Sequence, residues 1–134
     1  MTLKKVLLAE DDPDIQKVAK MSLKFAGVAE VVVVDNGEDC LVAAVRDKPD
    51  VILLDVMMPK MDGYEACRRL KADAATRPIP VIFLTAKAQQ FEMKKGLDLG
   101  ACGYLTKPFN PMTLHAEIAA LVEAAAGGKD PKSP

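Results

Sequence analysis

The chain has 134 residues, half of them hydrophobic, and its 18 basic and 19 acidic residues leave a net charge of −1. This composition excludes a disordered chain, because there is enough apolar surface to offset the chain entropy lost on folding. It also argues against direct binding to nucleic acid, which needs a basic surface, and the apolar runs are too short to span a membrane.

Cysteine usage points to a reducing compartment. Cys40, Cys67 and Cys102 are odd in number and are never spaced as close pairs, so neither a disulfide framework nor a zinc knuckle fits. Residues 1–5 lack the apolar stretch of a secretory signal. We therefore expect free thiols in a cytoplasmic protein that does not contact the membrane.

Five short apolar runs of strand length recur along the chain. They cover residues 6–9, 31–34, 51–54, 81–84 and, more weakly, 103–105. The central three are apolar at every position. Continuous apolarity is typical of strands in a parallel sheet that is covered on both faces.

Segments with helical spacing separate these runs. The first helix is expected to open at Asp12-Pro13 and to close at Gly27, and the residues of its pattern are Ile15, Val18, Ser22 and Phe25. Two more helices are expected at about residues 37–46 and 64–72.

The last two helices differ in quality. The one at about residues 89–99 is the poorest, because Gly96 inside it costs about 1 kcal/mol relative to alanine. We expect Gly96 to serve a close packing contact rather than mobility. The last helix follows Asn110-Pro111, and its apolar stripe consists of Leu114, Ile118, Leu121, Val122 and Ala125.

The alternation of five strands and five helices predicts an α/β fold with a parallel sheet and right-handed crossovers. The expected domain covers residues 1–126. Residues 127–134 contain no large apolar side chain, and we interpret them as a flexible tail or the start of a linker.

Polar residues follow four of the five predicted strands, at the edge of the sheet where ligands of open parallel sheets bind. These residues are Glu10, Asp11, Asp12, Asp55, Thr85, Thr106 and Lys107. Neighbouring carboxylates raise each other's pKa unless a cation lies between them, and Mg²⁺ prefers such oxygen ligands. Helix capping accounts for Asp12 alone, and the only histidine, His115, lies on the last helix, so a softer metal is not expected.

This set of groups suggests transfer of a phosphoryl group to a carboxylate. Aspartate is a known phosphoryl acceptor, and Mg²⁺, the Lys107 ammonium and the Thr85 hydroxyl would share the three equatorial oxygens. The sequence contains no phosphate-binding loop and no dinucleotide fingerprint.

Four segments resemble the receiver domain of two-component response regulators, in order and in spacing. They are LLAEDD at 7–12, PDVILLDVMMPKMDG at 49–63, LTA at 84–86 and GACGYLTKPF at 100–109. The resemblance extends over about residues 4–125. It implies a flavodoxin-like, doubly wound (βα)5 fold whose five parallel strands lie in the order 2-1-3-4-5.

The resemblance implies a role for each acidic residue that matches the family motif. Asp55 matches the aspartate that is phosphorylated. Asp11 and Asp12 match the acidic pair that holds Mg²⁺, together with Asp55 and the backbone carbonyl of Met57.

It also implies roles at the ends of the last two strands. Lys107 matches the lysine that contacts the phosphoryl group, and its bond to Pro108 is similar to one that is cis in the family. Thr85 matches the hydroxyl that follows the phosphoryl group, and Ala86 leaves room beside it. Tyr104 matches the aromatic residue that turns inward as the threonine moves.

Three further residues flank the site. Glu10 precedes the acidic pair, Met57 lies two residues after Asp55, and Lys87 lies two residues after Thr85. The family varies at the last two positions, which influence how long the phosphoryl group survives. We expect Met57 to shield the acyl phosphate from water.

The implied protein is a signalling phosphoacceptor rather than an enzyme that acts on an external substrate. A sensor histidine kinase or a histidine phosphotransfer protein would phosphorylate it, and its readout surface would be about residues 89–125. That Gly96 eases a shift of this surface is a second hypothesis beside the packing contact. We expect a single-domain regulator, monomeric or dimeric on phosphorylation, that binds a downstream protein or relays the phosphoryl group.

Three alternative functions fit the sequence less well. A phosphatase with an aspartyl nucleophile usually carries a second acid two residues later, where this chain has Met57. A flavin-binding module would need a phosphate loop, and the chain has no tryptophan to stack on the ring. A degenerate receiver, which is never phosphorylated, would not be expected to keep all five site residues that match the family, namely Asp11, Asp12, Asp55, Thr85 and Lys107.

Overall fold

The computed structural model describes residues 3–86 and 90–126, in which five strands alternate with five helices. In chain order the elements are β1 (Lys5–Ala9), α1 (Pro13–Phe25), β2 (Glu30–Val34), α2 (Gly37–Asp47), β3 (Val51–Asp55), α3 (Gly63–Ala72), β4 (Val81–Thr85), α4 (Gln90–Asp98), β5 (Gly103–Thr106) and α5 (Leu114–Ala126). The expected tail at 127–134 lies outside the described residues.

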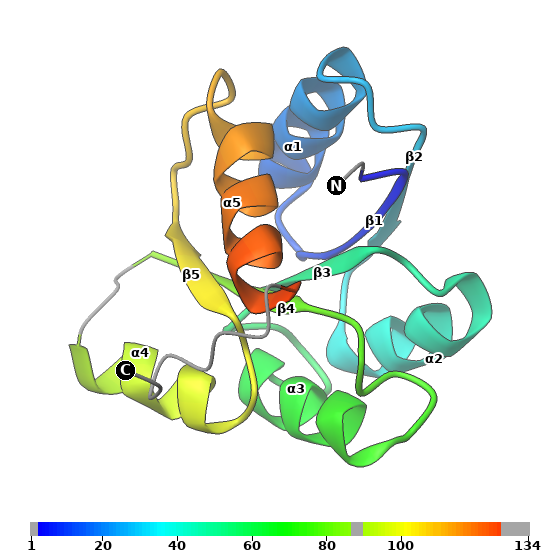
Figure 1. Cartoon of the computed structure of the whole chain (residues 1–134), viewed down its shortest axis with the longest axis vertical. Coiled ribbons are helices and arrows are strands. Elements are labelled where there is room, and N and C mark those ends of the chain that lie inside the picture. The colour runs from blue at the N-terminus through cyan, green and yellow to red at the C-terminus, as the bar shows by residue number, and fades with distance from the viewer. Residues whose placement is uncertain (1–2, 87–89, 127–134) are drawn as a thin grey trace.

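The five strands form one parallel sheet in the order β2-β1-β3-β4-β5 (Figure 1). This order confirms the predicted doubly wound fold. The chain moves outward from β1 to β2, then crosses to β3 on the other side of β1. The carboxyl ends of β1 and β3 therefore meet at the point where the winding reverses, which is where open α/β sheets bind ligands.

Helices cover both faces of the sheet, with α1 and α5 on one side and α2, α3 and α4 on the other (Figure 1). Every residue of β3 and β4 is buried. This two-sided burial is the physical reason that both strands are apolar at successive positions.

The bounds of α1 agree with prediction, but its expected apolar face was wrong. The helix buries Ala19 and Leu23, whereas Val18 is 41% and Phe25 is 92% exposed. Spacings of three and four residues fit more than one stripe of a helix. A small alanine faces the sheet because it allows the helix to pack closely, and this choice depends on packing that the spacing alone does not specify.

Side-chain caps fix the starts of the first three helices. Asp12, Asn36 and Asp62 each accept a hydrogen bond from a backbone N–H of the first turn of α1, α2 and α3. In α5 the predicted stripe is confirmed at Leu114, Ile118 and Val122, which are fully buried. Among the described residues, no helix is long and apolar enough to cross a membrane.

Candidate functional site

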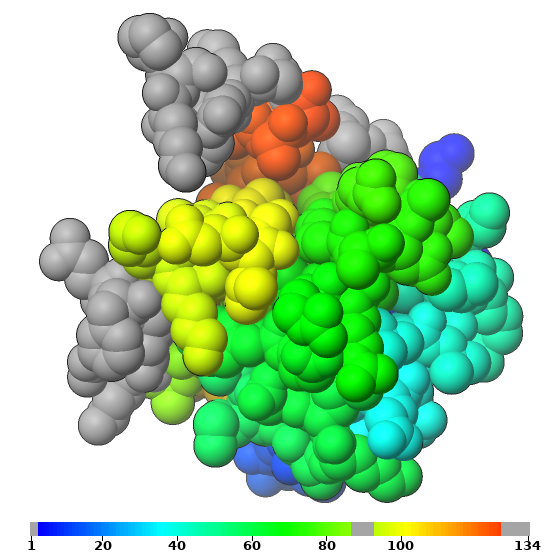
Figure 2. All heavy atoms as spheres, turned by 90° about the horizontal axis from the view of Figure 1, so that it is seen from below, coloured from blue at the N-terminus to red at the C-terminus, as the bar shows by residue number. Residues whose placement is uncertain are grey.

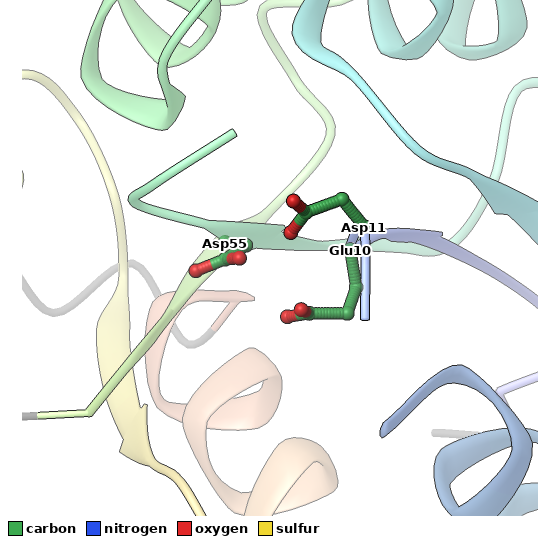
Figure 3. A group of neighbouring side chains, drawn as sticks. All are labelled: Glu10, Asp11 and Asp55. Atoms are coloured by element: carbon green, nitrogen blue, oxygen red, sulfur yellow. The ribbon is translucent and has the colours of Figure 1, made fainter. Parts of the chain in front are cut away.

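Three carboxylates converge at the carboxyl end of the sheet. Glu10 and Asp11 directly follow β1, and Asp55 is the last residue of the neighbouring strand β3. One oxygen of each lies within 4.8 Å of the others, and Figure 3 shows the three side chains directed toward a common space. Glu10 and Asp55 are 1% and 3% exposed, while Asp11 is open to solvent.

Lys107 supplies a positive charge to this cluster from the loop after β5. Its Nζ donates to Glu10 Oε2 at 3.1 Å and to Asp55 Oδ1 at 3.2 Å. Its backbone N–H donates to the carbonyl of Thr85 at 2.8 Å, which ties the end of β5 to the end of β4. The Lys107–Pro108 peptide bond is cis, as the family resemblance implied.

Burial and the neighbouring charges shift the pKa values of Glu10 and Lys107 in this cluster. Burial, and then the charge of Asp55, raise the pKa of Glu10 to about 7, although Lys107 and the N–H of Asp12 act in the opposite direction. Burial alone would lower the pKa of Lys107, but Asp55 and Glu10 outweigh it and the net shift is upward. A single ammonium therefore serves two buried carboxylates.

Asp12 is not part of this cluster, although the family resemblance implied that it belongs to the metal-binding pair. Its carboxylate accepts a hydrogen bond from the N–H of Asp14 and caps α1, while its own N–H donates to Glu10 Oε1 at 3.1 Å. Glu10, which we expected only beside the site, occupies the inward position. The N–H of Glu10 continues the pairing of β1 with β2 by donating to the Val34 carbonyl.

The signal that distinguishes the two acids was present in the sequence. Asp12 directly precedes Pro13, and an aspartate followed by a proline in the first turn is a helix start. The capping role assigns the Asp12 carboxylate to the helix. The inward pair is then Glu10 and Asp11.

The cluster has the donor chemistry of a magnesium site. All three groups offer carboxylate oxygens, which are the hard ligands that Mg²⁺ takes alongside several waters. A dication would also relieve the repulsion between the buried carboxylates. The residues present therefore fit the ion that the sequence predicted.

The structure describes some of the residues that flank Asp55 and Thr85. The N–H of Met57 donates to Asp55 Oδ1 at 3.3 Å, and its side chain is 76% exposed. The proposed metal contact of its carbonyl stays a prediction. Thr85 is buried at the end of β4 and Ala86 is exposed beside it. Lys87 lies outside the described residues.

Tyr104 is half-buried on β5 and packs toward α4. Its ring lies 5.3 Å from that of Phe83, and its hydroxyl accepts a hydrogen bond from the N–H of Gly96 at 3.1 Å. Sequence reasoning expected a close contact at Gly96 but gave no partner for it. The structure supplies that partner in Tyr104.

The fold and the acidic site together define a protein class. The profile of the response regulator receiver domain matches residues 6–119, so the chain belongs to this family of two-component signalling proteins. It is 39% identical over 119 residues to the alkaline phosphatase synthesis transcriptional regulatory protein PhoP of Bacillus subtilis, an alignment that covers 89% of this chain and 48% of PhoP. The chain thus spans about half of the length of this relative.

Solved structures agree with this assignment. The chemotaxis response regulator CheY4 of Vibrio cholerae matches with a TM-score of 0.83 and 32% identity, covering 90% of this chain and 99% of CheY4. The receiver domain of the sensor histidine kinase PA1611 of Pseudomonas aeruginosa matches with a TM-score of 0.81 and 34% identity, covering 91% and 99%. That structure holds a magnesium ion coordinated in its active site cleft.

Proposed function

We propose that the chain accepts a phosphoryl group on Asp55 from a histidine donor, a sensor kinase or a histidine phosphotransfer protein, in a reaction that requires Mg²⁺. One observation carries the proposal: the Asp55 carboxylate is buried at the winding reversal of the sheet, between an acidic pair and the Lys107 ammonium. A buried carboxylate in that setting is costly unless it is used.

The groups around Asp55 suit an in-line displacement. Within the described residues both hydrogen bonds to the carboxylate are to Oδ1, which leaves Oδ2 to attack phosphorus. A new O–P bond forms as the donor's N–P bond breaks, and the donor imidazole leaves. Lys107 then neutralises the transferred phosphoryl oxygens, and the Thr85 hydroxyl, on the adjacent strand, is the second donor to them.

Glu10 and Asp11 would hold the magnesium ion together with Asp55. When bound, the ion supplies positive charge to the phosphoryl oxygens. In hydrolysis, water would attack phosphorus and regenerate the Asp55 carboxylate with release of inorganic phosphate. The chain would thereby limit the lifetime of its own signal.

The acceptor assignment predicts a single phosphorylated product. Intact mass after incubation with Mg²⁺ and acetyl phosphate should show one added phosphoryl group on the native chain and none on Asp55→Asn. Asp98→Asn, which changes an exposed aspartate of α4, is the matched control and should behave like the native chain. An adduct that persists in Asp55→Asn, or no adduct on the native chain, would contradict the proposal.

The metal assignment predicts that Glu10 and Asp12 differ. We expect Glu10→Gln to lower the affinity for Mg²⁺ at about pH 8 by roughly tenfold or more, because it removes an anionic ligand. Asp12→Asn should leave the affinity unchanged, since asparagine caps helices as well as aspartate does. Titration calorimetry measures both, and the reverse order would restore Asp12 to the metal-binding pair.

The same experiment has a pH signature. The pKa of Glu10 in the metal-free protein is raised to about 7, so Glu10 binds a proton below that pH, and Mg²⁺ must displace it. The Mg²⁺ affinity of the native chain should therefore fall up to about tenfold per pH unit below about pH 7. This slope should flatten in Glu10→Gln, and an equal slope in both proteins would contradict the role of Glu10.

The side chain of Met57 is expected to slow loss of the phosphoryl group. It is exposed directly beside Asp55 and presents an apolar surface where a polar side chain would orient a water. We predict that Met57→Asn dephosphorylates faster, by about 3-fold to 10-fold, which is less than the roughly 100-fold that a full general base contributes, because an amide only orients the water. Decay of the phosphorylated mass after removal of acetyl phosphate measures the rate, and an equal or slower rate would refute this.

The proposed output is a shift in the surface formed by α4, β5 and α5, which binds a downstream protein or passes the phosphoryl group on. Tyr104 lies on this surface, three residues before Lys107 in the chain. The additional phosphoryl charge at Asp55 would act on Lys107 and so on the end of β5. We place the exchange in the cytoplasm, where thiols such as the free Cys40, Cys67 and Cys102 stay reduced.

A further inference from the structure

Three aromatic rings from three different elements form a row beneath α4. Tyr64 of α3 and Phe83 of β4 have ring centroids 5.1 Å apart, and Phe83 and Tyr104 of β5 have centroids 5.3 Å apart. Phe83, in the middle, is fully buried. We call these three residues the aromatic row. Spacings of this size are those of favourable ring pairs.

Helix α4 contacts this row at both ends through two consecutive residues. The N–H of Gly96 donates to the Tyr104 hydroxyl at 3.1 Å. The ammonium of Lys95 lies 4.3 Å from the centroid of the Tyr64 ring, in a cation–π contact. On the face shown in Figure 2, the green surface of α3 adjoins the yellow surface around the end of α4.

The fit at Gly96 is too close for any side chain. A Cβ at this position would lie 2.2 Å from the Tyr104 hydroxyl oxygen and 2.8 Å from Cδ2 of Phe83. The backbone of α4 therefore rests directly on the row. The contact is specific to one position of the helix, because a shift by a residue would bring a side chain into this space.

Both ends of the row are anchored to the acceptor site. Tyr64 follows Gly63, whose N–H donates to the Val56 carbonyl at 2.9 Å, and Val56 directly follows Asp55. At the other end, Tyr104 lies on the strand that leads to Lys107. The row thus joins the loop after the acceptor to the strand that carries the lysine.

We propose that Lys95 and Gly96 form a two-point latch that holds α4 on the aromatic row while Asp55 is a free carboxylate, and that occupation of the acceptor site and release of this latch are thermodynamically linked. The Lys95–Tyr64 contact makes α3 part of the device, in addition to the tyrosine on β5. The linkage rests on the proposed phosphoacceptor function, whereas the latch itself does not.

The direction of the linkage follows from the contacts that the free carboxylate makes. Lys107 bonds Asp55 Oδ1 directly in the arrangement that also contains the latch. A phosphoryl group on Asp55 would redirect Lys107 toward the phosphoryl oxygens and so displace the end of β5. Contacts that favour the free-carboxylate arrangement oppose that displacement, so their loss must strengthen binding of a phosphoryl mimic.

The test compares two adjacent lysines of α4. Lys95→Met removes the cation over Tyr64, and Lys94→Met makes the same change on an exposed lysine whose partner is Asp98. With beryllofluoride and Mg²⁺ as the probe, we expect Lys95→Met to bind about threefold more tightly than the native chain, the size of an exposed cation–π contact. Lys94→Met should bind as the native chain does.

Tyrosine fluorescence provides the binding signal, because the chain has two tyrosines, Tyr64 and Tyr104, and no tryptophan. Both lie at the ends of the row. In a Tyr64→Leu background, which removes the ring, Lys95→Met should have no further effect on beryllofluoride affinity. This double-mutant cycle separates the cation–π contact from a general effect of charge on α4.

Amide hydrogen exchange at Gly96 tests the latch without any ligand. We expect this amide to exchange faster in Lys95→Met than in Lys94→Met. Equal exchange and equal beryllofluoride affinity in the two variants would overturn the latch. If the native chain binds no beryllofluoride, the phosphoacceptor function and the linkage both fail, while the exchange rates still decide whether Lys95 holds α4 in place.

Discussion

Replacing Lys107 with alanine is expected to destabilise the metal-free protein by about 3 kcal/mol at about pH 8, the scale of a broken buried ion pair. The side chain is 16% exposed, and its ammonium is shared by the buried carboxylates of Glu10 and Asp55. Without it, both carboxylates lose their direct cationic partner. Urea unfolding of the native and variant chains measures the difference in the free energy of unfolding.

The pH dependence of the stability loss in Lys107→Ala distinguishes the loss of the ammonium charge from a simple loss of packing. The folded-state pKa of Glu10, already raised to about 7 from 4.5, should rise further when the ammonium is removed. A carboxyl group whose pKa is higher in the folded protein than in the unfolded chain stabilises the fold fully at pH values below the unfolded-state pKa. This contribution is lost as the pH rises through the folded-state pKa. The deficit of Lys107→Ala should therefore be larger at about pH 8 than at about pH 6.

Two further measurements on Lys107→Ala test the role of the ammonium: the effect of Mg²⁺ on stability and the rate of phosphorylation. Mg²⁺ should restore part of the lost stability, because the ion replaces one positive charge with two. Phosphorylation by acetyl phosphate should nevertheless slow by roughly 100-fold, the usual effect of removing one preorganised charge-stabilising group.

Lys94→Ala, which breaks an exposed ion pair on α4, is the control and should change the free energy of unfolding by less than about 0.5 kcal/mol. A deficit that is independent of pH would show that Lys107 acts through packing alone.

The sequence specified the sheet more completely than the helix faces. Val51–Asp55 and Val81–Thr85 are buried at every position, and the four apolar residues that begin each of them are typical of a strand covered on both faces. In α1, by contrast, Leu23 faces the core and Phe25 faces solvent, although both fit helical spacing. Which stripe is buried depends on how closely the helix approaches the sheet, and the small side chain of Ala19 decides that.

The candidate site was predictable where each residue sits at the end of its own strand. Asp55 and Thr85 are the last residues of β3 and β4, and Lys107 directly follows β5, so topology alone brings them to one edge. Glu10 and Asp12 belong to one run of acids, in which a shift of one residue changes the predicted metal-binding pair, and the helix start at Asp12-Pro13 is the one sequence signal that distinguishes them. The aromatic row depends on contacts between α3, α4, β4 and β5 that are distant in sequence, so no local pattern announces it.

Gly63→Ala is expected to cost about 3 kcal/mol of stability, at the upper end of what overpacking in a core costs. A Cβ at this position would lie 2.2 Å from the carbonyl oxygen of Asp55 and 3.0 Å from Cα of Val56. Both neighbours are backbone atoms, so no side chain can turn aside to make room. Chemical denaturation of the native and variant chains measures the loss.

The same substitution should also weaken the site, because the atoms that must move belong to Asp55, one of the three carboxylates proposed to hold the ion. We expect the Mg²⁺ affinity of Gly63→Ala to fall by about tenfold, since small displacements of a ligand carry costs of that order. Gly27→Ala is the control: its φ of 103° strains any side chain, but no atom lies within 4 Å of the added Cβ. It should cost about 1 kcal/mol, through backbone strain, and leave Mg²⁺ affinity unchanged. If the two alanine variants gave the same result in both measurements, the close approach of α3 to the end of β3 would not be the reason for a glycine at position 63. The loop after Asp55 would then be able to adjust to a side chain there.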